Sequence, residues 1–187
     1  MRGVLVCFIL FLLLVSTPRN PILPEPPTVI AEVLMDSVAT ALFDEAVECI
    51  KQHEGWHGSK QFPYVGYGHK LLPRESFTAE ISVEIADSLL RADLLQKCST
   101  FRAFGKDSLI LGVLAYNVGE YRLLGLGSMP KSNLIRKLEN GDRDIYEEYI
   151  SFRRYRGKVI PSIENRRKAE YELLFDKTFL TMKYDGN

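Results

Sequence analysis

The 187-residue sequence predicts a mainly α-helical domain of the α+β class, with a helical lobe and a small β-hairpin lobe after the first helix. Three observations predict this class of fold. Apolar residues recur every three or four positions over much of the chain, which is the period of an amphipathic helix. One stretch, residues 56–68, instead mixes aromatic residues and Val with Gly and Pro. Residues 108–119 are apolar nearly all round, as expected of a central buried helix.

The amino terminus precedes this domain and differs from it in composition. Residues 4–15 form an unbroken apolar run, too short to span a bilayer comfortably, since a span takes about 20 residues. A run of this length is typical of the apolar region of a signal peptide. We therefore expect export to the periplasm or the cell exterior, with residues 1–17 either cleaved as a signal peptide or retained as a membrane anchor.

Five prolines then follow within ten residues, from Pro18 to Pro27. Proline at this density blocks helix formation and favours an extended spacer. The expected layout is therefore a Pro-rich linker over residues 18–35, a folded domain over residues 36–176, and a frayed tail over residues 177–187.

Each element of the domain has a local reason in the sequence. The first helix, Val38 to His53, has apolar residues three or four positions apart and is stopped by Gly55. The β-favouring residues of the next segment predict the hairpin. Thr78 is a suitable N-cap for a second helix that runs to about Cys98. Further helices are expected from Asp107 or Ser108 to Gly119, from Ser132 or Asn133 to Asn140-Gly141, over Asp142 to Arg154, and over Ser162 to Phe175.

Charge and cysteine content limit the function. The 24 basic and 24 acidic residues cancel, so bulk charge indicates no polyanionic partner such as nucleic acid. Cys49 and Cys98 are compatible with a disulfide outside the cytoplasm or with two buried thiols. No Cys/His spacing of a metal site occurs, so we expect neither metal nor another cofactor. We expect a monomer.

Four short motifs occur in a characteristic order. They are HEGW from His53, YVGYGHKL from Tyr64, AYNVG from Ala115, and PSIENRRKAEYELLF from Pro161. Together they resemble the landmarks of phage-type lysozymes, glycoside hydrolase family 24, and suggest a divergent exported bacterial or phage-derived member. The resemblance implies a two-lobed lysozyme fold. It also implies hydrolysis of the β-1,4 bond between N-acetylmuramic acid (MurNAc) and N-acetylglucosamine (GlcNAc) in peptidoglycan.

Glu54, at the end of the first helix, is the expected general acid. Cleavage of a glycosidic bond needs a carboxylic acid that protonates the leaving oxygen. Beside Trp56 and the aromatic lobe, this carboxyl would be partly desolvated, which favours its protonated form. Substrate contacts are expected from Trp56, Tyr64 and Tyr67 through their rings, from Gly66 through close backbone approach, and from Asn117 through its amide, unless Asn117 caps its helix.

The sequence departs from the family at the second carboxylate. Family members usually carry an Asp shortly after the Glu, but here no Asp or Glu lies between Glu54 and Glu75. His57 is a candidate base in its place. Alternatively, an N-acetyl or hydroxyl group of the substrate does this work, as in a lytic transglycosylase that releases an anhydro product. A peptidoglycan-binding module without catalysis is a further alternative.

His69, which closes the GYGH motif, is either a direct catalyst or a histidine hydrogen-bonded between the lobes. Arg166, Arg167 and Glu170 are expected to pair and to fix the last helix against the β lobe. The first half of the last helix lies in a basic stretch, residues 151–168, with seven basic residues and one acidic residue.

The basic stretch indicates either a solvated surface or attraction to an anionic wall polymer. A helical scaffold that binds nucleic acid is less favoured, because no recognition module accompanies the stretch. A wall-cutting domain behind an export segment would serve lysis, or local remodelling that admits a secretion or conjugation apparatus.

Overall fold

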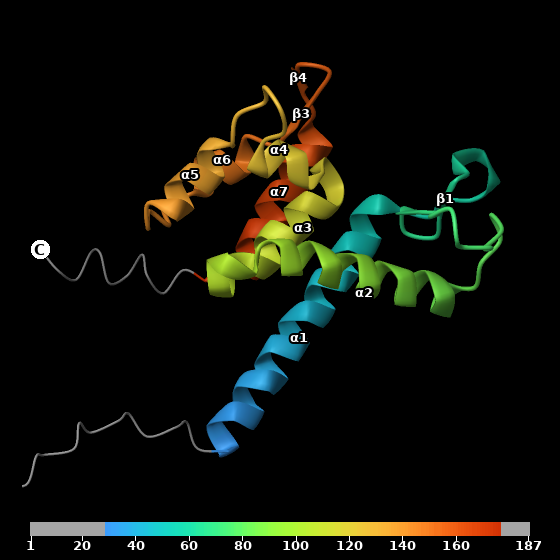
Figure 1. Ribbon diagram of the computed structural model, residues 1–187, viewed down its shortest axis with the longest axis horizontal. Helices are drawn as coiled ribbons and strands as arrows, with labels where there is room; N and C mark the ends of the chain where they lie inside the picture. The colour runs from blue at the N-terminus through green and yellow to red at the C-terminus, as the bar shows by residue number, and fades with distance from the viewer. Residues whose placement is uncertain (1–28, 177–187) are drawn as a thin grey trace, which may run out of the picture.

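A computed structural model describes residues 29–176 of the chain, with side chains from residue 39 onward. The expected signal segment, linker residues 18–28 and the tail over residues 177–187 lie outside this range. Within it, seven α-helices and two small antiparallel hairpins form a helical lobe and a hairpin lobe (Figure 1), which confirms the predicted fold class. In the described range no helix has the length and hydropathy that crossing a membrane requires.

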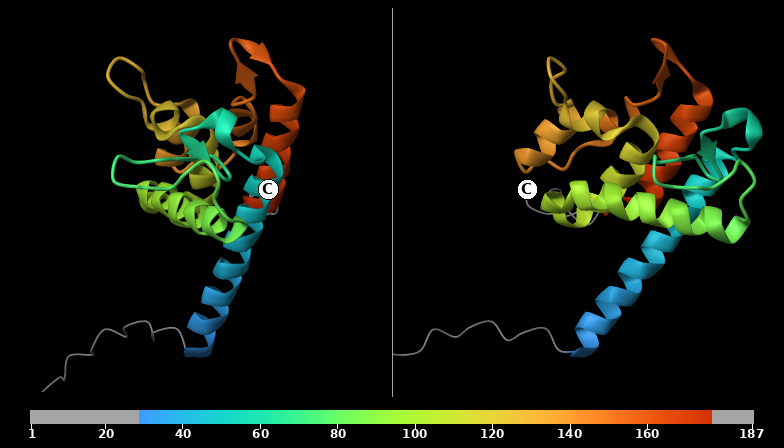
Figure 2. Two further views of the ribbon diagram at one scale, coloured as in Figure 1. Left: turned by 90° about the vertical axis from the view of Figure 1, so that its right-hand side faces the viewer. Right: turned by 45° about the vertical axis from the view of Figure 1, so that its right-hand side comes forward.

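Helix α1 (Val29–Glu54) is longer than predicted. It begins nine residues before the expected start at Val38, so the last residues of the expected linker, 29–35, are helical. The sequence explains the difference, since no proline follows Pro27 until the helix has ended. The first turns of α1 project away from the other elements, and its last turns enter the domain (Figure 2), where Ala46, Val47 and Ile50 are fully buried.

The hairpin lobe, residues 55–82, follows α1 directly, as predicted. It contains a short 3-10 helix η1 (Ser59–Gln61) and the strands β1 (Tyr64–Val65) and β2 (His69–Lys70). The strands pair with Tyr64 opposite Lys70 and Val65 opposite His69. His57 adds a bridge to Gly66 through two backbone hydrogen bonds of 2.7 and 3.1 Å.

Gly66 is buried where the hairpin lobe rests on the second helix, α2 (Val83–Thr100). Its φ of +57° is in the left-handed region, and an added Cβ would lie 2.6 Å from Cβ of Ala86. A side chain is therefore excluded by both backbone conformation and packing. This packing gives Gly66 a structural role in addition to the sugar approach that the sequence predicted.

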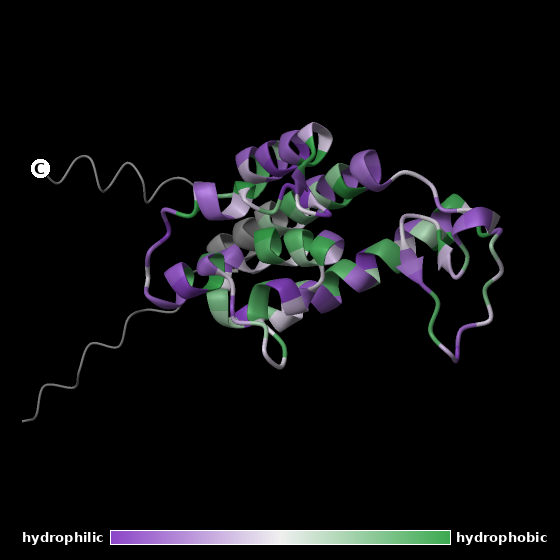
Figure 3. Ribbon diagram, turned by 90° about the horizontal axis from the view of Figure 1, so that it is seen from above, coloured by the Kyte–Doolittle hydropathy of each residue, from purple (hydrophilic) through white to green (hydrophobic). Residues whose placement is uncertain are grey.

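Ser82, rather than the expected Thr78, caps α2. The Ser82 hydroxyl accepts a hydrogen bond from the Ile85 amide, whereas the Thr78 hydroxyl bonds locally with the backbone of Glu80. After the 3-10 helix η2 (Arg102–Asp107), helix α3 (Ser108–Val118) forms the centre of the helical lobe, as predicted. Apolar segments gather around this centre (Figure 3).

The rest of the helical lobe includes two features that the sequence did not predict. One is the short helix α4 (Glu120–Leu124) after Gly119. The other is a second hairpin, which follows α6; the helix expected over residues 142–154 forms only over Tyr146–Ile150. The hairpin turns at Arg156 and Gly157, which both have positive φ. The remaining elements are α5 (Asn133–Glu139), α6 (Tyr146–Ile150), β3 (Arg154–Tyr155), β4 (Lys158–Val159) and α7 (Pro161–Leu174).

Cys49 and Cys98 are free thiols, which decides between the two alternatives that the sequence left open. Burial raises the pKa of both thiols, that of Cys98 to about 11. Because of the raised pKa values, both thiols stay protonated at neutral pH and are poor nucleophiles.

Candidate active site

Glu54 is the last residue of α1, at the point where the hairpin lobe begins. Its side chain is 19% exposed. One carboxylate oxygen, Oε1, accepts hydrogen bonds from Arg166 Nη1 at 2.8 Å and from Asn117 Nδ2 at 3.0 Å. Among the described residues Oε2 has no hydrogen-bond partner. The carboxyl group is thus held by one oxygen, and the other is open to a ligand.

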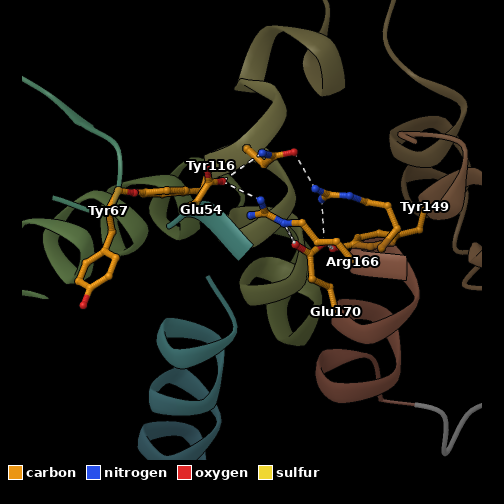
Figure 4. A network of polar contacts seen from close by, with 8 residues as sticks. Glu54, Tyr67, Tyr116, Tyr149, Arg166 and Glu170 are labelled. Atoms are coloured by element: carbon orange, nitrogen blue, oxygen red, sulfur yellow. Dashed lines mark hydrogen bonds and ion pairs between the residues drawn. The ribbon is translucent and has the colours of Figure 1, made fainter. Parts of the chain in front are cut away.

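These contacts belong to a closed ring of polar side chains (Figure 4). From Glu54 the ring runs through Asn117, whose Oδ1 accepts from Arg167 Nη2 at 2.6 Å. It returns through Glu170, whose two oxygens accept from Arg167 Nη1 and Arg166 Nε, each at 2.7 Å. Three helices far apart in sequence, α1, α3 and α7, therefore meet at the candidate acid.

The ring is buried but electrically balanced. Arg167 and Glu170 are fully buried and Arg166 is 7% exposed, which would be costly without partners. The two carboxylates and two guanidinium groups of the ring cancel. Burial alone lowers the pKa of Arg166, but the carboxylates of Glu170 and Glu54 more than offset this and raise it. Outside the ring, the hydroxyl of Tyr149 on α6 donates a further hydrogen bond to Glu170 at 2.9 Å.

The surroundings of Glu54 are more polar than the sequence suggested. The prediction placed this carboxyl against aromatic groups, whereas the structure pairs it with Arg166. The same guanidinium also binds the carboxylate of Glu170, so its charge is shared between the two carboxylates.

Aromatic rings of the hairpin lobe lie close to Glu54 in sequence and are open to ligands. Trp56 is 46% exposed and meets Tyr67 edge to face, with ring centroids 5.5 Å apart. Tyr64 is 42% exposed. The half-buried Tyr116 on α3 donates its hydroxyl to the backbone carbonyl of Tyr67 at 2.9 Å. The hairpin lobe is thus tied to the central helix, with two exposed rings.

His57 is half-buried between the β1 region and Gly68. Its ring centroid lies 6.4 Å from that of Tyr64. A Cβ added to Gly68 would lie 3.6 Å from the His57 ring and 3.9 Å from the hydroxyl of Tyr116. The Nδ1 atom of His57 is buried with no hydrogen-bond partner among the described residues. The ring is thus close to the strand junction, with one nitrogen sheltered from solvent.

His69 links the two lobes. Its Nδ1 lies 2.7 Å from Oδ2 of Asp93 on α2, and its Nε2 lies 2.9 Å from Oε2 of Glu75. Burial alone lowers the pKa of His69, but the hydrogen bonds to the two carboxylates raise it above 6.5. With both ring nitrogens engaged, the geometry favours the bridging role over direct catalysis.

We expect His69→Asn to destabilise the protein in a pH-dependent way. Because the folded-state pKa is raised, the stabilisation is fully present below pH 6.5 and is lost as pH rises through the folded-state value. The loss in the variant should be about 1–2 kcal/mol at its largest, the size of hydrogen bonds to charged groups.

Urea unfolding of both proteins at a series of pH values measures this difference. His53→Asn is the matched control, because burial and the nearby Arg166 lower the pKa of His53. A constant difference between the native protein and His69→Asn across this pH range would contradict the bridging role.

Sequence reasoning missed the main partners of Glu54. Asn117 was expected to cap its helix or to bind substrate. Gly119 occupies the cap position, and the amide of Asn117 contacts Glu54 and Arg167, while substrate binding stays a prediction. Arg166, Arg167 and Glu170 form ion pairs as predicted, but the ring joins α7 to α1 and α3 rather than to the β lobe. The signal was present in the spacing RRxxE, which places Glu170 within reach of both arginines.

The carboxylate of Glu170 is unsuited to replace the missing Asp. Its oxygens bind two arginines and a tyrosine, and it is fully buried. Among the described residues, no group of three or more His, Cys, Asp and Glu side chains is arranged to hold a metal ion.

Comparison with models of protein families matches residues 47–170 to the family described as phage lysozyme. The matched span covers more than half of the chain. It begins in the last turns of α1, includes the whole hairpin lobe, and ends at Glu170. No curated protein matches the sequence.

Proposed function

The chain belongs to the phage lysozyme family, and from this premise we propose that Glu54 is the general acid with which it cuts peptidoglycan strands. The family implies a glycoside-hydrolase type of enzyme that acts on peptidoglycan. The proposal specifies the β-1,4 bond between MurNAc and GlcNAc. The observation that carries it is the carboxyl of Glu54, held through Oε1 by Arg166 and Asn117 while Oε2 is open.

In this mechanism Oε2 of Glu54 delivers a proton to the glycosidic oxygen as the bond to the sugar carbon breaks. The ring fixes the carboxyl through its other oxygen, so little orientational freedom is lost when the substrate binds. Trp56, Tyr64 and Tyr67 supply aromatic surfaces for the sugar rings, and Gly66 packs the hairpin lobe against α2.

The second half of the reaction has two routes. In hydrolysis, a base takes a proton from water as its oxygen attacks the sugar carbon, and His57 is our candidate for this base. In transglycosylation, a hydroxyl of the same sugar attacks that carbon, and Glu54, having given its proton to the leaving oxygen, takes up the hydroxyl proton. The second route needs no further carboxylate, and the sequence between Glu54 and Glu75 provides none.

Digestion of purified peptidoglycan by the full chain, followed by mass analysis of the fragments, tests the proposal. We expect soluble fragments. Products with a reducing end would indicate a lysozyme, and products with an anhydro sugar would indicate a lytic transglycosylase. A folded chain that binds intact wall but releases no fragment would overturn the enzymatic proposal in favour of the binding module.

The proposal includes the site of action. Peptidoglycan lies outside the cytoplasmic membrane, and the apolar run at residues 4–15 is of the kind that directs export. We therefore place the enzyme in the periplasm or outside the cell, released or tethered, where it opens the wall for lysis or for a secretion or conjugation apparatus.

A further inference from the structure

Two short projections stand at the end of the molecule that lies opposite the beginning of α1 (Figures 1 and 2). One is the loop between α4 and α5, residues 125–132, and the other is the hairpin β3–β4. A cavity of about 500 Å³ separates α4 from the hairpin. The loop and the hairpin are thus separate elements that project in the same direction.

The loop ends in a pair of apolar side chains. Leu126 and Met129 exchange two backbone hydrogen bonds of 3.0 and 3.1 Å around Gly127 and Ser128. Residues that lie opposite each other in an antiparallel pair point to the same face. Leu126 is 73% exposed and Met129 is 46% exposed. The tip of the loop therefore presents two apolar side chains together, and neither belongs to the core of the helical lobe.

The hairpin combines apolar and basic side chains on both of its faces. In the register of β3 and β4, Tyr155 lies opposite Lys158, and Arg154 lies opposite Val159. All four residues are exposed. At the turn, the guanidinium of Arg156 lies 5.2 Å from the ring centroid of Tyr155. Each face of the hairpin thus presents one apolar or aromatic side chain beside one cation.

The cations of the hairpin are not neutralised within the described part of the chain. Arg153 pairs with Glu164, but Arg154, Arg156 and Lys158 have no carboxylate within ion-pair distance among residues 39–176. Neither the loop over residues 125–132 nor the segment over residues 152–160 contains an acidic residue. The projections therefore have an excess of positive charge, which is complementary to an anionic partner.

We propose that the two projections dock the protein on the surface of an anionic lipid bilayer. Leu126 and Met129 enter the boundary between headgroups and acyl chains, as the apolar side of an interfacial segment does. Tyr155 lies at the level of the headgroups, where tyrosine is enriched. Arg154 and Arg156 bind the lipid phosphates. This contact is separate from the proposed cleavage and holds the protein at a membrane without any catalytic step.

The shape of the surface favours a bilayer over a protein partner. A stable protein interface needs a continuous complementary surface of about 800 Å² on each partner. Here a cavity lies between α4 and the hairpin, and the exposed apolar side chains stand on two separate projections. A fluid bilayer accommodates separate projections, because its headgroups and acyl chains rearrange around each of them.

Sedimentation of the full chain with lipid vesicles tests the proposal. Vesicles of phosphatidylethanolamine and phosphatidylglycerol are compared with vesicles of phosphatidylcholine alone. We expect at least about tenfold tighter binding to the anionic vesicles. Arg154→Gln with Arg156→Gln should weaken that binding about 25-fold, because each cation near an anionic surface contributes about fivefold. Leu126→Ser with Met129→Ser should weaken it about tenfold or more.

The control pair Arg74→Gln with Arg102→Gln removes the same charge from exposed positions outside the projections. We expect it to leave binding to the anionic vesicles within about twofold of the native value, because distant charges are screened. The apolar run at residues 4–15 is present in every variant, so differences between the proteins report on the projections.

Tryptophan quenching locates the contact. Leu126→Trp and, as the control, Leu72→Trp on the hairpin lobe are mixed with vesicles that contain brominated phosphatidylglycerol. Position 72 is 58% exposed, and Trp56 is the only native tryptophan. Quenching beyond the native level is expected for Leu126→Trp alone.

Three outcomes would overturn the proposal. They are binding that all variants share equally, equal binding to both kinds of vesicle, and quenching at position 72 but not at position 126. A self-associated chain that Leu126→Ser with Met129→Ser separates into monomers would also overturn it, and would assign the surface to a second copy.

Discussion

Glu54→Gln will reduce the rate of peptidoglycan cleavage by about a thousandfold or more while the protein stays folded. Glutamine cannot donate the proton that the leaving oxygen requires. Its side-chain oxygen still accepts from Arg166 and Asn117, so the polar ring keeps its shape. We expect the free energy of unfolding to change by only about 1–2 kcal/mol. Initial rates of fragment release and urea unfolding measure the two quantities.

Glu48→Gln is the matched control for this variant. Glu48 lies on the same helix, is 59% exposed and pairs with Lys51 at 2.7 Å, so its loss should leave the rate of cleavage unchanged. Cleavage by Glu54→Gln within tenfold of the native rate would contradict the role of Glu54 as general acid, whatever products are formed.

The elements that the sequence predicted correctly have strong local signals. The apolar α3, the hairpin after Glu54 and the end of α3 at Gly119 follow from hydrophobic period and glycine alone. The second hairpin has no such signal, because its turn is Arg156-Gly157 rather than the usual Asn-Gly or Asp-Gly. Thr78 and Ser82 are both suitable caps, and tertiary packing of the hairpin lobe on α2 decides between them.

In the candidate site, too, local sequence patterns are informative, whereas contacts between distant residues leave no local signal. Glu54 is the candidate acid that the sequence offers, because a carboxylate before a glycine- and aromatic-rich turn is a local pattern, and its catalytic role stays a prediction. Its partner Arg166 lies 112 residues away, and no local rule connects the two. His69 was left open between two roles, and its contacts with Asp93 on α2 and with Glu75 in the loop before α2 favour the bridge. Long-range pairing is thus what the sequence alone could not supply.

Glu170→Ala will be among the most destabilising substitutions in the protein. It removes the carboxylate that neutralises two arginines, leaving Arg167 and most of Arg166 buried without that partner. Breaking a buried ion pair from one side typically costs about 3–5 kcal/mol, a large part of the stability of a domain of this size. The hydroxyl of Tyr149 also loses its acceptor. Urea unfolding at neutral pH measures the change, with the exposed Glu172→Gln on the same helix as the control.

Glu170→Gln tests the role of the ring's charge while it keeps a side chain of the same size at position 170. Glutamine keeps an oxygen that accepts hydrogen bonds, so the variant should fold, but the net charge of the ring rises from zero to +1. The unshared charge of Arg166 then stabilises ionised Glu54, which has to be protonated to act as an acid. We expect the alkaline side of the pH–rate profile to move to lower pH, with the acidic side unchanged. A purely structural role for Glu170 predicts a lower rate with an unshifted profile, and that outcome would separate the ring from the chemistry of Glu54.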